Sequence, residues 1–292
     1  IPDLIPPKEH PKPEYDFGVA YPDPESIPIS ELINSLSTGL EEEGKDLAYY
    51  PHPDGYTPLR EFVSKKLSLE RNIDIGPEQI ILTDGSLESI YTVSEVLIDK
   101  GDVVLTEKYA YSGTLRIFKR FNAHVIGVEC DQFGMIPSDL EKKIIAIKNS
   151  RKKIKLLYTI PTFQNPLGFC VPESRRIELL SITQTFQIPI LEDDCYVDLN
   201  YEKNNYPSIY SLDSSKSVIY VGSFSKTSVN LAARIETITP EGEIYLSDSA
   251  NILLNKTQYS TDSVGKYQFK GKDNEIEVYK VNFRYSTKKI DG

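Results

Sequence analysis

The stretch that decides the fold is Val218-Ile219-Tyr220-Val221-Gly222-Ser223-Phe224-Ser225-Lys226, an apolar run that ends in a small turn with two hydroxyls and a lysine. The run predicts a buried strand, and the turn follows at its carboxyl end. A lysine amine in that place can form a Schiff base with an aldehyde cofactor, and the hydroxyls can hold its phosphate. The same residues also suit a strand that leads into an exposed loop lysine, so this stretch alone leaves both interpretations open.

Upstream of this stretch, apolar runs alternate with helix-like segments. We expect strands at Ile80–Thr83, Val103–Thr106, His124–Val128, Lys155–Thr159, Ile188–Leu191 and Val218–Val221. We expect helices at about Ser30–Glu42, Thr57–Arg71, Ser86–Asp99, Ser112–Phe121, Ser138–Lys148 and Glu173–Thr185. Ser30, Thr57 and Ser138 are the candidate N-caps. The alternation predicts an α/β domain with a mostly parallel sheet, whose ligands bind beyond the carboxyl ends of the strands.

Composition narrows the class of partner. The 292 residues carry a net charge of −10, which argues against nucleic acid or an anionic membrane as the main partner. No apolar run is long enough to span a membrane. The three cysteines (Cys130, Cys170, Cys195) form no close pair, so we expect buried free thiols in a reducing cytoplasm. The scattered histidines have no metal-ligand spacing, and we expect no metal site.

The first residues give no targeting signal. The chain starts at Ile1 without an initiator methionine and without a basic-then-apolar pattern. A fragment of a longer protein is therefore one expectation. Residues 1–28 are rich in proline and are expected to form an extended arm.

A candidate phosphate site lies at Thr83-Asp84-Gly85-Ser86-Leu87, where a predicted strand meets a predicted helix. Glycine permits a tight turn, and the N–H groups and positive dipole end of the helix favour an anion. The same pattern also describes an ordinary capped turn, and the segment alone does not choose between the two.

Two more loops follow predicted strands. Tyr111 lies in Glu107–Gly113, where its ring could stack on a planar cofactor or could serve as a core aromatic. Asn165 lies in Pro161–Gly168, where its amide could reach a ring oxygen or could simply belong to an Asn-Pro turn.

An acidic group ends another apolar run, in Ile190-Leu191-Glu192-Asp193-Asp194-Cys195-Tyr196. A carboxylate at the end of a buried strand needs a partner, and a protonated pyridine nitrogen would be one. The spacing places Asp193 and Tyr196 around the same small volume. An acidic loop that faces solvent is the alternative.

In this order, the five segments resemble the fold-type-I pyridoxal-phosphate enzymes, and most closely the class I/II aminotransferases. Within these, the chain is similar to the kynurenine/2-aminoadipate aminotransferase group and to the aminotransferase-like domain of regulators with an N-terminal winged helix. Tyr50–Arg60 also matches that group. The resemblance covers about residues 15–227 and implies pyridoxal 5'-phosphate as cofactor.

The resemblance also implies a role for each residue. Lys226 would form the internal aldimine and then carry the proton between Cα and the cofactor. Asp193 would keep the pyridine nitrogen protonated, and Tyr111 would stack on the ring. Asn165 and Tyr196 would donate to its phenolic oxygen. The phosphate would be held by Ser86, by the backbone of Gly85 and Leu87, by Ser223 and by Ser225.

The implied reaction is amino transfer from an amino acid to a 2-oxo acid, by a cytoplasmic homodimer. A regulatory domain that binds pyridoxal phosphate without efficient turnover is an alternative. The substrate amino acid cannot be read, because the family's C-terminal small domain and its carboxylate-binding arginine are absent. The Pro-Gly-x-Arg stretch that should follow Ser-x-Ser-Lys is also missing, although Arg234 lies near the distance of its phosphate-binding arginine.

After Lys226 the chain resembles the C-terminal end of class III nucleotide cyclases, over residues 228–282. The matching segments are a helix at Val229–Ile238, a strand at Glu243–Ser247 and a hairpin of Val264–Lys270 with Ile276–Val281. The resemblance implies that Asn230 and Arg234 orient a ribose and stabilise a transferring phosphate. The metal-binding aspartates of such cyclases are not found.

We therefore divide the chain into three parts. These are an arm and helix (1–50), a truncated cofactor-binding domain (51–227) and a cyclase-like segment (228–292). A genuine fusion, a rearranged or artefactual junction near Thr227, a cyclase fragment and a non-functional hybrid all remain open.

Overall fold

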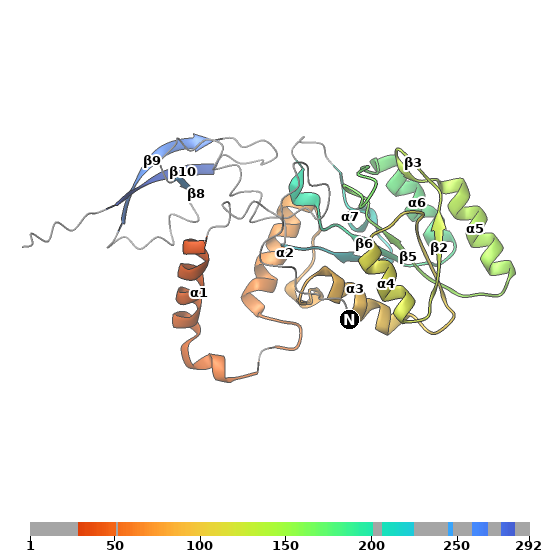
Figure 1. Cartoon of the computed structure of the whole chain (residues 1–292), viewed down its shortest axis with the longest axis horizontal. Coiled ribbons are helices and arrows are strands. Elements are labelled where there is room, and N and C mark those ends of the chain that lie inside the picture. Colours follow the sequence, from red (N-terminus) through yellow and green to blue (C-terminus); the bar gives the residue numbers. More distant parts are fainter. Residues whose placement is uncertain are drawn as a thin grey trace, which may run out of the picture.

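The computed structural model describes residues 29–50, 52–200, 206–224, 245–247, 259–267 and 276–283. Within them, the largest sheet is parallel and has the strand order β2-β1-β5-β6-β7 (Figure 1). Its strands are β1 (Val103–Glu107), β2 (His124–Val128), β5 (Ile154–Thr159), β6 (Ile190–Asp193) and β7 (Val218–Val221). The predicted α/β class with a mostly parallel sheet is confirmed.

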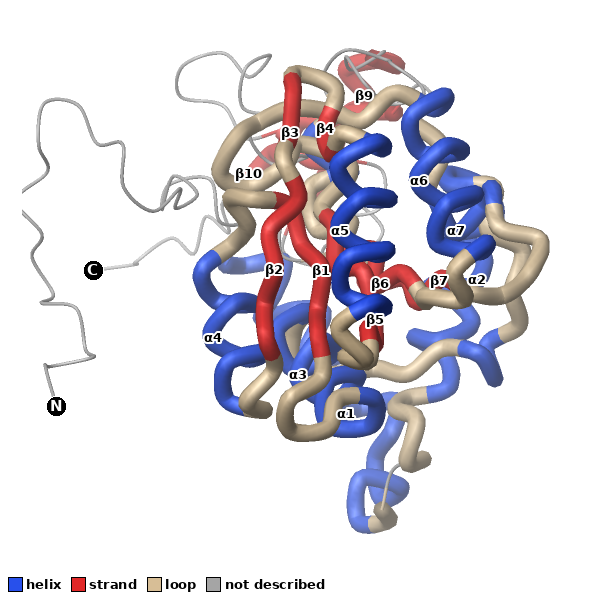
Figure 2. Tube along the Cα trace, turned by 90° about the vertical axis from the view of Figure 1, so that its right-hand side faces the viewer, coloured by secondary structure: helices blue, strands red, loops and turns tan. Residues whose placement is uncertain are grey.

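Helices cover both faces of this sheet (Figure 2). On one face lie α3 (Ser86–Leu97) and α4 (Ser112–Arg120), and on the other α5 (Pro137–Asn149), α6 (Glu173–Thr185) and α7 (Ile209–Leu212). Successive strand residues point to opposite faces, so Val104 packs with Ile90 and Phe118 while Val103 packs with Leu140. Burial on both faces explains why the strands appear as continuous apolar runs.

The strand predicted at Ile188–Leu191 is shifted by two residues. The observed strand β6 runs from Ile190 to Asp193, because its ladder with β7 pairs Ile190 with Val218 and Asp193 with Val221. The shift carries Asp193 into the last position of the strand.

The strand predicted at Ile80–Thr83 is wrong. These residues follow a 3₁₀ turn, η3 (Pro77–Gln79), and no strand pairing includes them among the described residues. To a distant part of the described backbone they make one bond, from the Leu82 N–H to the Asp54 carbonyl at 2.9 Å. An apolar run becomes a strand when a neighbour supplies its ladder of hydrogen bonds, and this run has no such neighbour in the described part.

The predicted N-caps are also wrong. Helix α1 runs over Ile29–Glu43, so Ser30 lies inside it, and α2 runs over Thr57–Arg71 with Tyr56 as the cap. Helix α5 starts at Pro137 and is preceded by Ile136. Proline in the first helical turn has a suitable φ and needs no N–H partner, which moves the starts of α2 and α5 ahead of the predicted cap residues.

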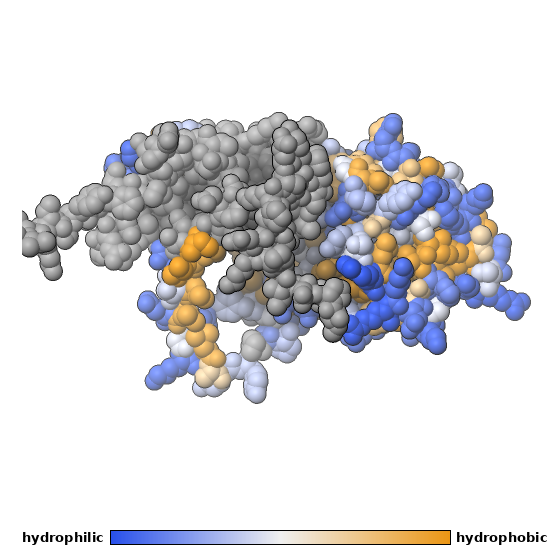
Figure 3. Space-filling view, viewed as in Figure 1, coloured by the Kyte–Doolittle hydropathy of each residue, from blue (hydrophilic) through white to orange (hydrophobic). Residues whose placement is uncertain are grey.

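Helix α1 exposes its apolar stripe (Figure 3). The exposed side chains are Ile29, Leu32, Ile33, Leu36 and Leu40. The helix continues into a 3₁₀ turn, η2 (Gly44–Ala48). No helix of the described residues has the length and apolar character that a membrane span requires.

A separate antiparallel sheet has the order β8-β10-β9. Its strands are β8 (Tyr245–Ser247), β9 (Tyr259–Tyr267) and β10 (Ile276–Phe283). The predicted hairpin is confirmed, although β9 starts at Tyr259 rather than Val264. The predicted helix at Val229–Ile238 lies outside the described residues. A short ladder, β3 (Cys130–Asp131) with β4 (Gly134–Met135), and a 3₁₀ turn, η4 (Val197–Leu199), complete the described elements.

Candidate active site

The carboxyl edge of the parallel sheet gathers most of the predicted site residues. Chain order reverses between β1 and β5, which are neighbours in the sheet, and loops beyond such a point leave a crevice. Tyr111 follows β1 and Asn165 follows β5. Asp193 is the last residue of β6, and Tyr196 comes three residues later. Ser223 follows β7. Ser225, Lys226, Asn230 and Arg234 lie outside the described residues.

Asp193 is the centre of a buried hydrogen-bond network. The Tyr158 hydroxyl donates to its Oδ2 at 2.7 Å, and the Cys195 thiol donates to its Oδ1 at 2.7 Å. Thr114 Oγ1 donates to the Tyr158 hydroxyl at 3.2 Å. Burial raises the pKa of the Asp193 carboxyl, and the bonds from Cys195 and Tyr158 oppose that rise. A buried carboxyl held in this way is ready for a cationic partner.

Tyr158 and Cys195 were not predicted as site residues. Tyr158 lies in β5, where a tyrosine in a buried run looks like a core residue, and it is 35 positions away from Asp193. The chain contains one weak signal, which is that a buried phenol normally needs a hydrogen-bond partner. All three cysteines are free, as predicted, but they are half-buried rather than buried.

Asn165 and Tyr196 are brought together beside Asp193. Asn165 Nδ2 donates to the Tyr196 hydroxyl oxygen at 3.0 Å. Burial raises the pKa of the Tyr196 phenol, and the Asn165 bond opposes it. Asp193 and Tyr111 both lie close enough to Tyr196 to affect that pKa electrostatically. An amide and a phenol therefore converge on one small volume next to the carboxyl group.

The Tyr111 ring lies against the backbone of Gly113. A Cβ atom at Gly113 would come within 2.5 Å of Tyr111 Cε1, so the ring occupies the space that any side chain would need. Tyr111 is the cap of α4 and is partly exposed. The glycine two residues after the tyrosine thus fixes the ring at the edge of the site.

The turn at Gly85 leads directly into α3. Gly85 has φ of +95°, a conformation that favours glycine, and nothing lies within 4 Å of where its Cβ would be. Its carbonyl accepts from the N–H groups of Glu88 and Ser89, which leaves those of Ser86 and Leu87 at the start of the helix. This geometry suits an anion at the helix N-terminus.

A side-chain contact links this turn to the Asp193 network. The Ser86 hydroxyl lies near the Cys195 thiol, and that thiol donates to Asp193 Oδ1 at 2.7 Å. Burial raises the pKa of that thiol, so the Cys195 proton stays in place and continues to donate. The predicted phosphate turn and the predicted pyridine partner are therefore joined through one residue.

Buried carboxyls brace the strand ends. Glu107, at the end of β1, accepts from Thr159 Oγ1 at 2.6 Å and from the Ile160 N–H at 2.9 Å. Burial raises its pKa to about 7. Glu192 accepts the N–H groups of Ile209 and Tyr210, at 2.8 and 2.9 Å. These contacts hold β1, β5, β6 and α7 in fixed positions around the site.

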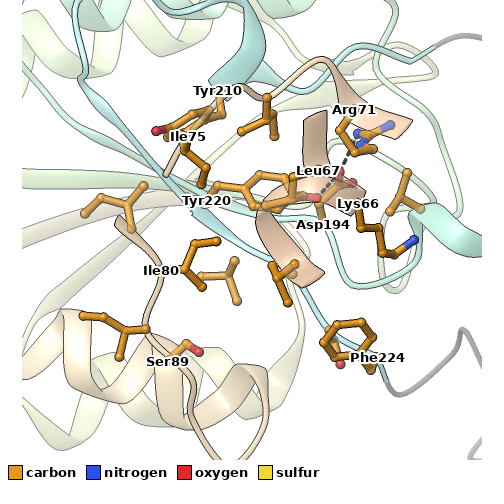
Figure 4. Close-up of a pocket in the computed structure, with 18 of the residues that line it drawn as sticks. Lys66, Leu67, Arg71, Ile75, Ile80, Ser89, Asp194, Tyr210, Tyr220 and Phe224 are labelled. Atoms are coloured by element: carbon orange, nitrogen blue, oxygen red, sulfur yellow. Dashed lines mark hydrogen bonds and ion pairs between the residues drawn. The ribbon is translucent and has the colours of Figure 1, made fainter. Parts of the chain in front are cut away.

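A cavity of about 600 Å³ borders the site without containing Asp193 (Figure 4). Thr83, Gly85 and Ser223 line its end nearest the phosphate turn. On its wall, Arg71 Nη2 binds Asp194 Oδ2 at 2.5 Å, and the Tyr220 hydroxyl donates to the same oxygen at 3.1 Å. Asp194 thus faces away from its neighbour Asp193 and ties α2 to the end of β6.

Comparison with known proteins identifies similar chains. The family described as "Aminotransferase class I and II" matches residues 20–235, and "Adenylate and Guanylate cyclase catalytic domain" matches residues 221–282. The two matches overlap over residues 221–235.

Among the curated relatives, one is named as an enzyme and another as a transcriptional regulator. "Aromatic-amino-acid aminotransferase 1" of Thermococcus litoralis is 32% identical over 205 residues, which cover 70% of this chain and 49% of that protein. The "Uncharacterized HTH-type transcriptional regulator YisV" of Bacillus subtilis is 31% identical over 216 residues, which cover 72% of this chain and 42% of that protein. The chain spans about half the length of the relatives that it matches.

A solved structure extends the comparison to three dimensions. LysN, the α-aminoadipate aminotransferase of Thermus thermophilus, aligns with a TM-score of 0.64 and 32% identity, over 72% of this chain and 52% of that one. That structure contains N-(5'-phosphopyridoxyl)-L-leucine.

Proposed function

Because this chain belongs to the class I and II aminotransferase family, we propose that its sheet edge binds pyridoxal 5'-phosphate and that the protein transfers amino groups between an amino acid and a 2-oxo acid. The observation that carries the proposal is Asp193, a buried carboxyl at the end of β6 with the Asn165–Tyr196 pair beside it. The chain spans about half of its relatives, so the activity is that of the protein in its complete form.

The described residues fit the cofactor. A planar ring needs a face to stack on, and Tyr111 offers one at the rim, with the Gly113 backbone behind it. A phosphate needs N–H donors, which the Gly85 turn and the start of α3 supply. A pyridine nitrogen needs an anionic partner, which Asp193 supplies.

When bound, pyridoxal phosphate supplies an aldehyde for a lysine amine and a protonated ring that withdraws electrons from the substrate. Asp193 holds the proton at the ring nitrogen, because its carboxylate is favoured next to a cation. Tyr158 and Cys195 position that carboxylate through both of its oxygens. Asn165 and Tyr196 donate to the ring oxygen, and Tyr111 keeps water from one face.

The remaining roles in the proposal belong to residues near or beyond Ser223. Ser223 and Ser86 bind the phosphate together with the backbone of Gly85 and Leu87. Lys226 would supply the amine for the cofactor aldehyde and would hold and move the substrate proton. Ser225 and Arg234 contribute further phosphate contacts, with Arg234 taking the place of the arginine of the missing Pro-Gly-x-Arg stretch.

Covalent labelling tests the site. The chain is incubated with pyridoxal phosphate, reduced with borohydride and digested, and the labelled peptide is identified by mass spectrometry. We expect the label on Lys226 and its loss in Lys226→Ala, whereas Lys216→Ala keeps it. Label on another lysine, or none, contradicts the site.

A second candidate function is favoured by the regulator among the relatives. In that case the domain binds the cofactor and reports its presence without efficient turnover. Formation of pyridoxamine phosphate from the cofactor-loaded, unreduced chain and a set of amino acids distinguishes the two. Product on the scale of the bound cofactor supports the transaminase, and binding without product supports the sensor.

The division into residues 1–50, 51–227 and 228–292 is part of this proposal. The last segment carries a likeness to the end of a cyclase domain, which supports a piece of that fold rather than a working cyclase. Such chemistry needs two metal ions held by carboxylates. We expect no cyclic nucleotide from ATP or GTP with manganese, and product that Asn230→Ala abolishes would contradict this.

A further inference from the structure

Two loops beyond neighbouring strands hold the ring-contacting side chains. Residues 108–113, the first loop, carry Tyr111 beyond β1, and residues 161–170, the second loop, carry Asn165 beyond β5. Both side chains lie close enough to Tyr196 to affect the pKa of its phenol, Asn165 through its hydrogen bond and Tyr111 electrostatically. In the proposed function both loops contact the same flat ring, so their relative position decides how well that ring fits.

One buried side chain joins the two loops. Gln164, directly before Asn165, is 2% exposed. Its Nε2 donates at 2.8 Å to the carbonyl of Tyr109, two residues before Tyr111. Its Oε1 accepts from the N–H of Leu167 at 2.7 Å. The donor end of this amide therefore crosses to the first loop, while the acceptor end stays in the second.

The base of the second loop is held separately. Arg176 is fully buried, and its guanidinium donates to the carbonyls of Pro161 and Val171, at 2.8 and 2.7 Å. These bonds tie the loop to α6 and do not reach the first loop. Among the described residues, the bond from Gln164 to Tyr109 is the one hydrogen bond between the two loops.

The second loop has a strained backbone just before Gln164. Phe163 has φ of +52°, a conformation that bulky side chains rarely adopt. Gln164 closes the turn that follows, because its N–H donates to the Phe169 carbonyl at 2.9 Å and its carbonyl accepts from the Gly168 N–H at 2.5 Å. Such strain persists only where surrounding contacts fix the shape of a loop. The shape of this loop therefore depends on Gln164.

The position of Gln164 suits an amide in particular. Its end must donate to one carbonyl and accept from one N–H, and a glutamine amide does both. A carboxylate would keep the acceptor but would place an oxygen against the Tyr109 carbonyl. We propose that Gln164 is a positioning residue, which sets the spacing between Tyr111 and Asn165 and so the fit of the cofactor ring. The identity of that ring rests on the proposed function.

Two substitutions separate the two bonds of this amide. Gln164→Met keeps the length of the side chain and loses both bonds. Gln164→Glu at pH 9, where the introduced carboxyl is ionised, keeps the acceptor for Leu167 and loses the donor to Tyr109. The probe is 4'-deoxypyridoxine 5'-phosphate, which has the ring and phosphate of the cofactor but no aldehyde. We expect each variant to weaken probe binding about tenfold, measured by calorimetric titration.

A double-mutant cycle tests whether Gln164 acts through the Tyr111 ring. Tyr111→Ala and Gln164→Met should each weaken probe binding about tenfold, and the double variant should bind little more weakly than either. Independent effects would multiply to about a hundredfold and would overturn the proposal. Gln184→Met is the matched control, because it removes an amide that donates to Asp213 outside both loops, at 2.9 Å. It should bind the probe like the parent chain.

A measurement without the probe separates this inference from the proposed function. The carbon-13 NMR shift of Tyr196 Cζ reports the bond from Asn165. It should change in Gln164→Glu at pH 9 and stay unchanged in Gln184→Met. An unchanged Tyr196 signal in Gln164→Glu overturns the positioning role, and so does probe binding equal to that of the parent. A changed signal in a protein whose parent chain does not bind the probe supports the positioning role and contradicts the proposed cofactor.

Discussion

Two apolar runs of similar sequence have different fates in this molecule. Lys155–Thr159 and Ile80–Thr83 both read as short strands before a functional loop. The first lies within β5, which pairs with β1 and β6 and is buried. The second has no ladder among the described residues and lines the cavity that β7 also lines. The difference shows that local sequence favours an extended backbone, and that the run becomes a strand only where a neighbouring strand supplies its ladder of hydrogen bonds.

The contrast extends to the loops that follow. The paired strands end in groups held by several contacts, such as Asp193 with its bonds from Tyr158 and Cys195. The unpaired run ends at Gly85, in a turn tied to that network through Ser86. Catalytic precision is therefore expected to come mainly from the paired side.

Core truncation should show the largest difference between the two runs. Leu157→Ala removes a fully buried side chain from the middle of the sheet and should cost about 2–5 kcal/mol of unfolding free energy. Ile81→Ala removes an exposed side chain and should change it by less than about 0.5 kcal/mol. Urea denaturation measures both. Comparable losses would mean that residues 80–83 are packed in solution as tightly as β5.

The buried carboxyl at the end of β1 should make stability depend on pH. Burial raises the pKa of Glu107 from 4.5 to about 7, so between these values the folded chain keeps a proton that the unfolded chain has released. Stability therefore falls as pH rises from about 4.5 to 7, by about 3 kcal/mol for this group. Glu107→Gln should remove that part of the fall.

Urea midpoints at pH 5 and pH 8 check this expectation. Glu95→Gln, on the exposed face of α3, is the matched control and should behave like the parent chain. Glu192 has a raised pKa for the same reason of burial, so some pH dependence should remain in Glu107→Gln. An unchanged pH dependence in Glu107→Gln would show that this carboxyl is already ionised in the folded state.

The end of the paired strand β6 and the turn after residues 80–83 can be compared by substituting Asp193 at the first and Ser86 at the second. Asp193→Asn should slow cofactor-dependent exchange of the Cα hydrogen of an amino acid by about a hundredfold, because one preorganised charge is lost. Ser86→Ala should weaken cofactor binding by about tenfold, because one hydrogen bond is lost. Deuterium incorporation and a cofactor titration measure these effects. A larger loss from Ser86→Ala would place the main support of the cofactor on the unpaired side.

Each loop at a strand end left two interpretations open by itself, and the site residues were predicted from the resemblance of the five ordered segments to the aminotransferases. Asp193, Tyr196 and Asn165 stand out as polar groups that follow apolar runs, and the structure brings them together. Tyr158 was missed because a tyrosine in an apolar run looks like a core residue, and Cys195 was missed because it was expected to be a buried free thiol. Their importance depends on the partner of each side chain, which is the Asp193 carboxylate. For Tyr158 that partner is far away in the chain, and for Cys195 it is reached through a turn.

The sequence by itself determined the alternation of strands and helices and the parallel class of the sheet, because these follow from local periodicity and turn chemistry, and its resemblance to the aminotransferases pointed to the functional loops. The tertiary structure decided which apolar runs became strands, where β6 ends, and which way Asp193 and Asp194 face. Those outcomes depend on partners far apart in the chain: Val221 sets the end of β6, Tyr158 binds Asp193, and Arg71 binds Asp194. Hydrogen-bond ladders and buried charges are satisfied only by neighbours in space, and local sequence does not specify those neighbours.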